Sequence, residues 1–484
     1  MRKSITIALA YVGLLVGAGF ASGQEVIQYF VAYGTMGMIG TIFAAIMLVV
    51  AGAVLFQLGS YFLADDHSAV YNNVSHPNVS RFLDWSTLLT LFCIGFVMLA
   101  GAGSNLAQQF DLPVWVGSVI MTVLLIISGF LNVEKLTNVI SMITPLLIIA
   151  VVGSLIYTIY SFGDVDIEAL NELSKENTAA AGVFGNWLLS ALNYAGLATI
   201  CGVSMILVIA GSHMNPRHAG TGGLIGGMVF SSLLVILVFV LFFNMEGVVG
   251  SDMPLLMVFD NFHPVVGTVV ALIIYAMIYN TAVGMFYGIG RRMSAKNPGN
   301  FKKWYFGTLA VGFLLSFVPF QSLVSWVYPV LGYLGIALVA ILTISWIKSR
   351  GDIVEETSRR ERLAELAESK LDPETDDLTM QERKEVLELV DESHMEDSAL
   401  WQSVQEEVAA ELDQDAENSF ELADHPHLDP DHEDYTGEWE KPGTITVEPV
   451  TADLSALARL LSPEQVDELP DGPVKKKIVA AQGR

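Results

Sequence analysis

Cysteine and charged residues are scarce in this sequence. Of its 484 residues only Cys93 and Cys201 are cysteines, and both fall in apolar segments. Two such cysteines support neither a disulfide framework nor a zinc site built from cysteine pairs. Charged residues make up 16% of the chain and hydrophobic residues 52%, a balance too apolar for a soluble enzyme. The composition therefore predicts an all-α protein that crosses a membrane several times.

Catalytic and phosphate-binding motifs are also missing from the apolar part of the chain. It contains no phosphate-binding loop, no HExxH and no GxSxG, so it has no basis for an ATP-driven pump or an intramembrane hydrolase. We therefore expect a protein that is not an enzyme and has no cofactor beyond a coupling ion.

Negative charge is concentrated near the C-terminus. Residues 1–350 contain 13 Lys and Arg and 14 Asp and Glu, whereas residues 351–484 contain 12 and 37. This predicts a membrane body over 1–350 and an acidic cytoplasmic tail over 351–484. The tail alternates helix-like pieces with segments too acidic and proline-broken to pack, so we expect it to be largely disordered or helical. Its basic runs are too short for nucleic acid, and its protein partner is unknown.

The body contains ten apolar segments, each about long enough to span a bilayer. They cover roughly residues 5–33, 36–63, 82–108, 114–131, 137–161, 183–212, 220–244, 265–290, 304–318 and 322–347. An even number of spans puts both ends of the body on one side. All but one of the body's basic residues then fall on that side, and Lys175 alone falls on the other. By the positive-inside rule we expect a multi-pass cell-membrane protein whose termini are cytoplasmic.

The first span contains the unusual stretch VGAGFASGQEVIQYF, residues 16–30. Gly17, Gly19 and Gly23 crowd the middle of a segment that is too long for one untilted helix. The alternative reading is close helix packing at small residues. Two half-helices fit better, and such a break survives in a membrane only where protein or a water-filled cavity satisfies the backbone.

Ser22 and Glu25 add polar groups to this stretch. Their spacing matches a capping box, which would start a helix near the bilayer centre. Glu25 is the one acidic residue well inside a span, and a charge there costs about 2.5 to 3.5 kcal/mol on insertion scales. It is either a structural cap or a functional group that carries a proton or contacts substrate.

A second interruption is expected in the sixth span, where Asn193, Tyr194 and Gly196 fall among apolar residues. Spans one and six are the first of two sets of five. Because five is odd, the second set enters the membrane from the opposite face, as in an inverted repeat. We therefore predict a 5+5 inverted repeat with broken helices 1 and 6.

The stretch VGAGFASGQEVIQYF resembles the first span of the YkvI-type membrane proteins, which are grouped with amino-acid permeases of the amino acid-polyamine-cation superfamily. The resemblance covers about residues 1–347. It implies the LeuT-type fold, with substrate held between the two broken helices. The resemblance places Gly17, Ala18 and Gly19 at the substrate, with Asn193, Tyr194 and Gly196 on the facing wall. The break itself adds Ser22, Gly23 and Glu25 as candidate substrate-binding residues.

The resemblance also implies a place for a sodium ion. The corresponding residues are Gly13, Val16, Met277, Asn280 and Thr281. Here Asn280 and Thr281 replace the serine-threonine pair of sodium-coupled members. Oxygen ligands suit a hard cation, but the same two side chains can simply bond across helices. Glu25 offers the rival scheme of proton coupling, and the sequence does not choose between sodium and proton.

These features together predict a secondary active transporter of a small organic solute, an amino acid or related amine, coupled to a cation by alternating access. The segment 251–264 is either an extracellular lid helix or a surface loop. The alternative function is a transporter-like sensor or scaffold that signals through the acidic tail.

Overall fold

The structure is a computed structural model, and it describes residues 2–130, 143–161, 166–176, 184–373, 375, 378–395, 397–414 and 418–429. All regular secondary structure in these ranges is helical, which confirms the all-α prediction. The chain divides into two compact units, residues 1–364 and 365–484. The first unit contains every expected span and ends inside the helix that follows residue 350.

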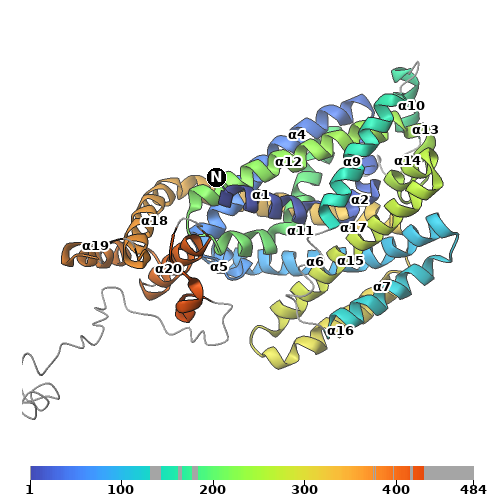
Figure 1. The fold of residues 1–484 in the computed structure, drawn as a ribbon. Coiled ribbons are helices and arrows are strands. Elements are labelled where there is room, and N and C mark those ends of the chain that lie inside the picture. The colour runs from blue at the N-terminus through green and yellow to red at the C-terminus, as the bar shows by residue number, and fades with distance from the viewer. Residues whose placement is uncertain are drawn as a thin grey trace, which may run out of the picture. The chain divides into compact units, whose positions relative to one another are not determined.

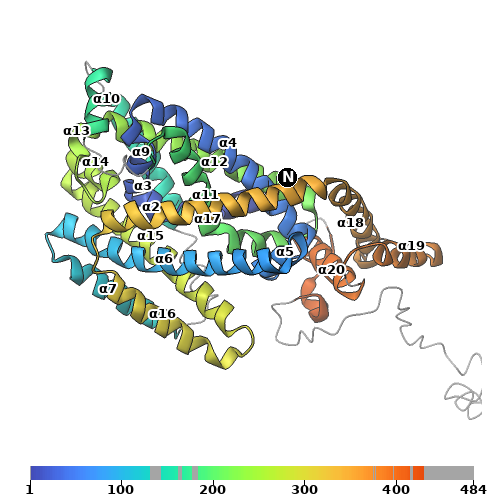
Figure 2. The same cartoon turned by 180° about the vertical axis from the view of Figure 1, so that it is seen from behind.

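The first unit is a bundle of long helices with several short ones at its ends (Figure 1). Its elements are α1 (Arg2–Leu15), α2 (Ala18–Ser22), α3 (Gln24–Tyr29), η1 (Val31–Tyr33), α4 (Thr35–Tyr61), α5 (His67–Val74), α6 (Pro77–Phe110), α7 (Val114–Ser128), α9 (Ile143–Tyr160), α10 (Ile167–Glu176), α11 (Trp187–Gly211), α12 (Pro216–Phe243), α13 (Met245–Val248), α14 (Pro254–Phe262), α15 (Pro264–Ser294), η3 (Pro298–Asn300), α16 (Phe301–Leu315), α17 (Phe320–Lys348) and the first part of α18 (Arg350–Leu371). Figures 1 and 2 show α4 beside α12 on one flank, α7 beside α16 on the other, and α6, α15 and α17 between them.

The expected spans coincide with these helices. Within the described residues, α4, α6, α11, α12, α15 and α17 are each long and apolar enough to cross a membrane. The remaining spans correspond to α1 with α2 and α3, to α7, to α9 and to α16, apart from residues 131 and 137–142, which lie outside the described residues. Large apolar side chains such as Ile46, Leu314 and Trp326 are exposed along the helices. An apolar exterior of this extent fits contact with lipid.

The two ends of the first unit carry different elements (Figures 1 and 2). The N-terminus and α5 lie at one end, which we call the α5 end, and α10, α13 and α14 lie at the other, the α14 end. Arg217 at the start of α12 and Arg292 at the finish of α15 lie at the α5 end, whereas Lys175 lies on α10. Lys135 is outside the described residues. That the α5 end faces the cytoplasm stays a prediction.

The first span is interrupted, as expected. Helix α1 ends at Leu15, and Gly17 is extended, with φ −89° and ψ −178°. A second interruption follows at Gly23, whose φ of 79° lies in the left-handed region that glycine adopts without strain. Beyond it, α3 runs only from Gln24 to Tyr29 before the chain turns into η1. The glycines therefore produce three short helices where one membrane helix would otherwise run.

The expected break in the sixth span is wrong for the described residues. Helix α11 runs without interruption from Trp187 to Gly211. Gly196 instead allows close packing: a side chain there would overlap the backbone of α17 at Gly332, and one at Gly335 would overlap Gly196. The small residue serves the helix contact. Residues 177–183, which precede this helix, lie outside the described residues.

The second unit contains the remainder of α18, α19 (Met380–Asp391), α20 (Asp397–Asp413), η4 (Leu422–Asp424) and η5 (Pro426–Leu428). Thr379 and Glu382 form a complete capping box at the start of α19. Leu400, Trp401 and Val404 are buried along α20. This part of the acidic tail is helical and has buried apolar side chains of its own.

Candidate functional site

The interrupted first span places the Glu25 carboxyl group directly over Gly19. A side-chain carbon added to Gly19 would overlap this carboxyl group, so the space it occupies exists only because Gly19 has no side chain. Every other residue of α3 from Gln24 to Tyr29 is buried, but Glu25 keeps part of its surface accessible. Glu25 is thus the one residue of α3 that is not fully enclosed by its neighbours.

Ser22 and Glu25 do not form the expected capping box. Gly23 is the residue at the N-cap of α3 and offers no side chain. The Ser22 hydroxyl accepts a hydrogen bond from the Gln24 backbone N–H at 3.1 Å and donates one to the Gly19 carbonyl at 2.8 Å. Gly23 lies between Ser22 and the first residue of α3, so Ser22 stands one residue before the N-cap position. The Glu25 side chain points back toward Gly19 instead. The serine thus holds the two short helices together, and the glutamate is left for another role.

Several backbone amides of the interrupted stretch already have acceptors within it. The N–H groups of Gly17, Ala21 and Gly23 donate to the carbonyls of Leu15, Gly17 and Phe20, respectively. Gly19 and Phe20 lie in the first turn of α2, where the residues four positions earlier precede the break. Their N–H groups have no backbone acceptor among the described residues.

Hydroxyl and thiol side chains surround Glu25. Those of Tyr29, Tyr194, Tyr328 and Cys201 lie close enough to interact electrostatically with its carboxyl group. Tyr29 and Tyr194 also contact each other edge to face at 5.4 Å. Tyr194 was expected in the site and lies there, whereas Tyr29, Cys201 and Tyr328 were not expected.

The expected site residue Asn193 lies behind this cluster rather than in an open wall. Its Oδ1 accepts a hydrogen bond from the Tyr29 hydroxyl at 3.1 Å, and its Nδ2 donates to the Pro329 carbonyl at 3.0 Å. It is fully buried. Asn193 therefore connects α3, α11 and α17 and orients Tyr29, while Gly196 serves the packing of α11 on α17.

Two buried polar atoms close to Glu25 lack hydrogen-bond partners among the described residues. They are Gln28 Oε1 and Tyr328 Oη. Gln28 lies one turn after Glu25 on α3, and its Nε2 donates to the Val324 carbonyl at 3.2 Å, one turn before Tyr328 on α17. The Tyr328 hydroxyl lies beside the Glu25 carboxyl group without making a hydrogen bond of normal geometry. Buried polar atoms of this kind call for a ligand or water.

No basic side chain forms an ion pair with Glu25 within the described part of the chain. A carboxylate in such surroundings is costly unless it gains a cation or a proton.

Gln28 could have been recognised from the sequence because it follows Glu25 by one helical turn. Pro329, a proline inside a predicted span, was the available signal for its neighbour Tyr328.

Helix α14 covers this region at the α14 end. The backbone N–H and Cβ of Leu255 lie 3.0 and 3.4 Å from where a side chain on Gly23 would begin. Gln108 of α6 holds the segment before α14: its Oε1 accepts from Ser251 Oγ at 2.8 Å and from the Met253 N–H at 2.9 Å. Most of the segment 251–264 is thus a helix, Pro254–Phe262, and its action as a lid stays a prediction.

The residues expected to hold sodium are only partly gathered. Thr281 of α15 lies beside Gly17, with 3.6 Å between its Oγ1 and the position of a side chain there. Helix α15 packs against α2 along this contact. Gly13 instead faces Thr144 of α9, and Met277 is fully buried. Asn280 is half-buried and Val16 is buried, and a sodium site at these residues stays a prediction.

A polar cluster joins four helices at the α5 end. His67, which is buried, contacts Ser204 of α11 at 2.9 Å and Asp84 of α6 at 3.0 Å. Arg292 of α15 donates to Asp84 at 2.9 Å and to Asp66 at 3.2 Å. These contacts connect α5, α6, α11 and α15 in a packed cluster at this end.

Asp66 belongs to the loop before α5, outside the spans. Burial alone would raise its pKa. Hydrogen bonds from Ser68 Oγ and the Ala69 N–H, together with the positive charge of Arg292, outweigh burial and lower the pKa below its usual value. Asp66 is therefore held in its charged form in this cluster.

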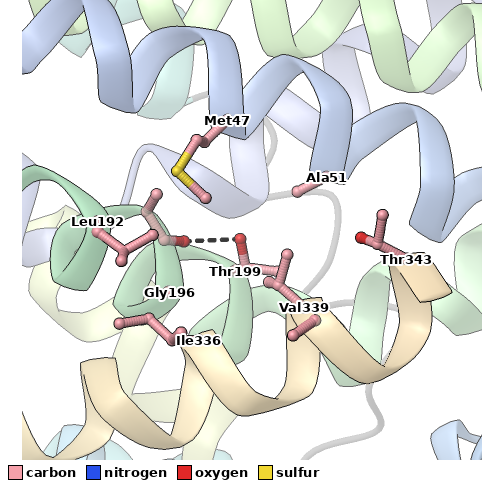
Figure 3. A pocket seen from close by; sticks show the side chains of 10 residues that line it. Met47, Ala51, Leu192, Gly196, Thr199, Ile336, Val339 and Thr343 are labelled. Carbon is pink, nitrogen blue, oxygen red and sulfur yellow. Dashed lines mark hydrogen bonds between the residues drawn. The ribbon is translucent and has the colours of Figure 1, made fainter.

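A separate apolar pocket of about 270 Å³ lies between α4, α11 and α17 (Figure 3). Its walls include Met47, Leu192, Ile336 and Val339, and the Thr199 hydroxyl donates to the Ala195 carbonyl at 2.7 Å. On α11 the pocket residues lie on the opposite side from Tyr194 and Cys201, which share a face because they are seven positions apart. The pocket is therefore not part of the Glu25 site.

Comparison with known proteins gives relatives whose function is also open. No family model matches the chain. It is 26% identical over 339 residues to the uncharacterized membrane protein YkvI of Bacillus subtilis, which covers 69% of this chain and 94% of YkvI. It is 22% identical to the uncharacterized protein YyaD of the same organism, over 72% of this chain and 98% of YyaD. Among solved structures, MhsT in complex with L-phenylalanine is 15% identical, with a TM-score of 0.49 over 82% of this chain and 98% of MhsT. The resemblance to the YkvI-type proteins is confirmed.

Proposed function

We propose that this chain, a relative of the YkvI-type membrane proteins, is a secondary active transporter of a small organic solute, an amino acid or related amine, coupled to sodium or protons. The observation that carries the proposal is the Glu25 carboxyl group in the interrupted first span, in a position that is open only because Gly19 has no side chain. It has no ion-pair partner among the described residues.

The chemistry of this site favours a cation. Glu25, Gln28 Oε1 and Tyr328 Oη supply oxygen atoms from two neighbouring helices, and neither neutral oxygen makes a hydrogen bond of normal geometry within the described residues. A protonated amine carries N–H donors for such acceptors and the charge that Glu25 requires. Substrate ammonium and coupling proton are therefore competing occupants of one carboxylate, and Glu25 acts in substrate contact, in coupling or in both.

The arrangement at the two ends suits alternating access. Helix α14 covers the interruption at Gly23 on one side, and the cluster of His67, Asp84 and Arg292 packs the other. A transporter opens one such closure at a time around a central site. The small interruptions at Gly17 and Gly23 give α2 and α3 freedom to move separately from α1.

The experiment that tests this proposal is a thermal-stability screen of the purified full-length protein against the amino acids and simple amines, with sodium and pH varied. A specific ligand stabilises the folded protein by about 2.7 kcal/mol at one hundred times its Kd. We expect one or more amine-bearing compounds to raise the melting temperature of the wild type. Loss of this shift in Glu25→Gln would assign substrate contact to the carboxyl group, and an unchanged shift would leave it the coupling role. If a well-folded wild type responds to none of them, the proposal is wrong.

The second candidate function is a sensor or scaffold that signals through the acidic tail, to which a protein partner would bind. The folded helices α19 and α20 favour this alternative. A chain that ends after Leu371, and so keeps α18 whole, distinguishes the two. Uptake that survives this deletion assigns transport to the body, whereas ligand binding without uptake in the full-length protein favours the sensor.

A further inference from the structure

Arg360 of α18 is almost completely buried, with 2% of its surface exposed, at the α5 end of the first unit. Its guanidinium group donates four hydrogen bonds. Nη1 donates to the Ser60 carbonyl at 2.8 Å and to the Met214 carbonyl at 3.1 Å, and Nη2 donates to the Tyr61 carbonyl at 2.8 Å. Nε donates to Glu356 at 2.8 Å. A side chain from a highly charged helix is thus embedded among main-chain groups of the membrane body.

The acceptors belong to two different helix ends. Ser60 and Tyr61 are the last residues of α4, and Met214 lies in the turn between α11 and α12. Carbonyl groups in the last turn of a helix have no N–H partner within that helix, and they carry partial negative charge. The planar guanidinium group, with several donors in a fixed fork, can satisfy carbonyls from both ends at once. A lysine has neither the shape nor the number of directed donors for this.

The two helix ends pack closely against each other because Gly59 has no side chain. A side chain on Gly59 would lie 2.5 Å from Ala210 and 2.8 Å from the Leu207 carbonyl. Ser60 Oγ donates to the His213 carbonyl at 2.6 Å. Arg360 therefore lies beside a close contact between α4 and α11 and donates hydrogen bonds to main-chain groups on both sides of it.

Further contacts fix α18 in this position. Asn215 Nδ2 donates to Glu361 Oε1 at 3.1 Å. Glu356, only 1% exposed, is held by Arg360 and by Arg359, whose Nη1 lies 2.6 Å from Glu356 Oε2. Ile353 belongs to the same hydrophobic core as the membrane helices. The buried charges are paired and hydrogen-bonded, which is the condition under which burial is tolerated.

We propose that residues 350–364 form an intramolecular clamp, in which Arg360 locks the end of α4 to the α11–α12 turn. The clamp makes this segment part of the membrane body, although it lies beyond the last apolar span. It also makes the separation of α4 from α11 at the α5 end depend on α18. Because α18 continues into the acidic part of the chain, anything that pulls or unwinds this helix would release the two helix ends. This inference does not rest on the proposed transport.

Hydrogen exchange of the full-length protein in detergent micelles tests the clamp. Arg360→Gln should raise amide exchange at residues 59–64 and 210–215 by at least tenfold, while residues 24–30 keep wild-type protection. Arg350→Gln is the matched control, since it removes the same charge from an exposed position at the start of the same helix, and should change neither region. Wild-type exchange at both helix ends in Arg360→Gln would overturn the proposal.

A second variant covers the case in which the unpaired Glu356 prevents Arg360→Gln from folding. The double variant Glu356→Gln with Arg360→Met removes both buried charges and keeps comparable volume. It should fold and show the same local rise in exchange. If the double variant protects residues 59–64 and 210–215 as the wild type does, α18 is not a clamp.

Discussion

Gly19→Ala is the sharpest perturbation of the Glu25 site, because it should separate stability from binding. An added methyl group would overlap the Glu25 carboxyl group, so this side chain must leave its position over α2. Gly19 lies within a helix and has no left-handed backbone angle. Alanine therefore fits the backbone and favours the helix by about 0.5 to 1 kcal/mol.

The expected loss of affinity follows from the displaced carboxylate. A hydrogen bond to a charged group contributes about 1.5 to 3 kcal/mol, which corresponds to a loss of roughly ten- to 150-fold in affinity. We expect Gly19→Ala to melt at or above the wild-type temperature and yet to bind the amine found in the stability screen at least tenfold more weakly.

Gly17→Ala is the control in the same interruption. Its added carbon would lie 3.6 Å from Thr281 Oγ1, an ordinary contact that displaces nothing. Binding should stay within about threefold of wild type, below the tenfold change that 1.4 kcal/mol produces. If Gly19→Ala binds with wild-type affinity, the placement of Glu25 in the site is wrong.

Four further substitutions test other parts of the account. Glu25→Gln keeps the shape of the side chain but carries no charge and no acid proton that it could exchange. If the variant loses ion-driven accumulation but still exchanges substrate, Glu25 acts in coupling; if it loses substrate binding, Glu25 contacts the substrate. Normal accumulation by the variant refutes both roles. Tyr328→Phe should weaken binding by about 1 kcal/mol without lowering the melting temperature, and unchanged affinity would remove this hydroxyl from the site. Gly335→Val should prevent folding because it overlaps Gly196, whereas Gly284→Val, with open space around it, should fold; equal yields of the two in size-exclusion chromatography would contradict the packing. Asp66→Asn should lower the free energy of unfolding by up to about 1 kcal/mol at pH 7. Because the pKa of Asp66 is lowered in the folded protein, its stabilising contribution is present above the usual aspartate range and is lost as the pH falls below that range. Asp65→Asn, at the exposed neighbouring residue, is the control, and equal melting curves of the two variants at pH 7 would contradict the ion pair.

The interruption of the first span could be predicted from sequence because its causes are local. Gly17 and Gly23 lie within one short stretch, and the left-handed angle at Gly23 is one that glycine adopts without strain. The finer geometry was harder. Ser22 and Glu25 have capping-box spacing, but the left-handed Gly23 takes the cap position, and no residue pattern distinguishes these outcomes in advance.

The sixth span shows why the facing wall was not predicted. Polar Asn193 and small Gly196 are equally typical of a broken helix and of a tight helix contact. What decides between them is Gly332 and Gly335 on α17, more than 130 residues away in the chain. Arg360 was missed for the same reason, since an arginine in a highly charged helix is usually solvated, and the carbonyls it binds belong to distant parts of the chain.

The most direct test of the central claim is transport by the purified protein in proteoliposomes. The solute that stabilises the wild type should accumulate inside the vesicles when an inward sodium or proton gradient is imposed, and a matching ionophore should abolish the accumulation. The Glu25→Gln variant, reconstituted at equal density, should not accumulate it. Specific binding to the wild type with no accumulation and no exchange under either gradient would contradict the assignment as a transporter.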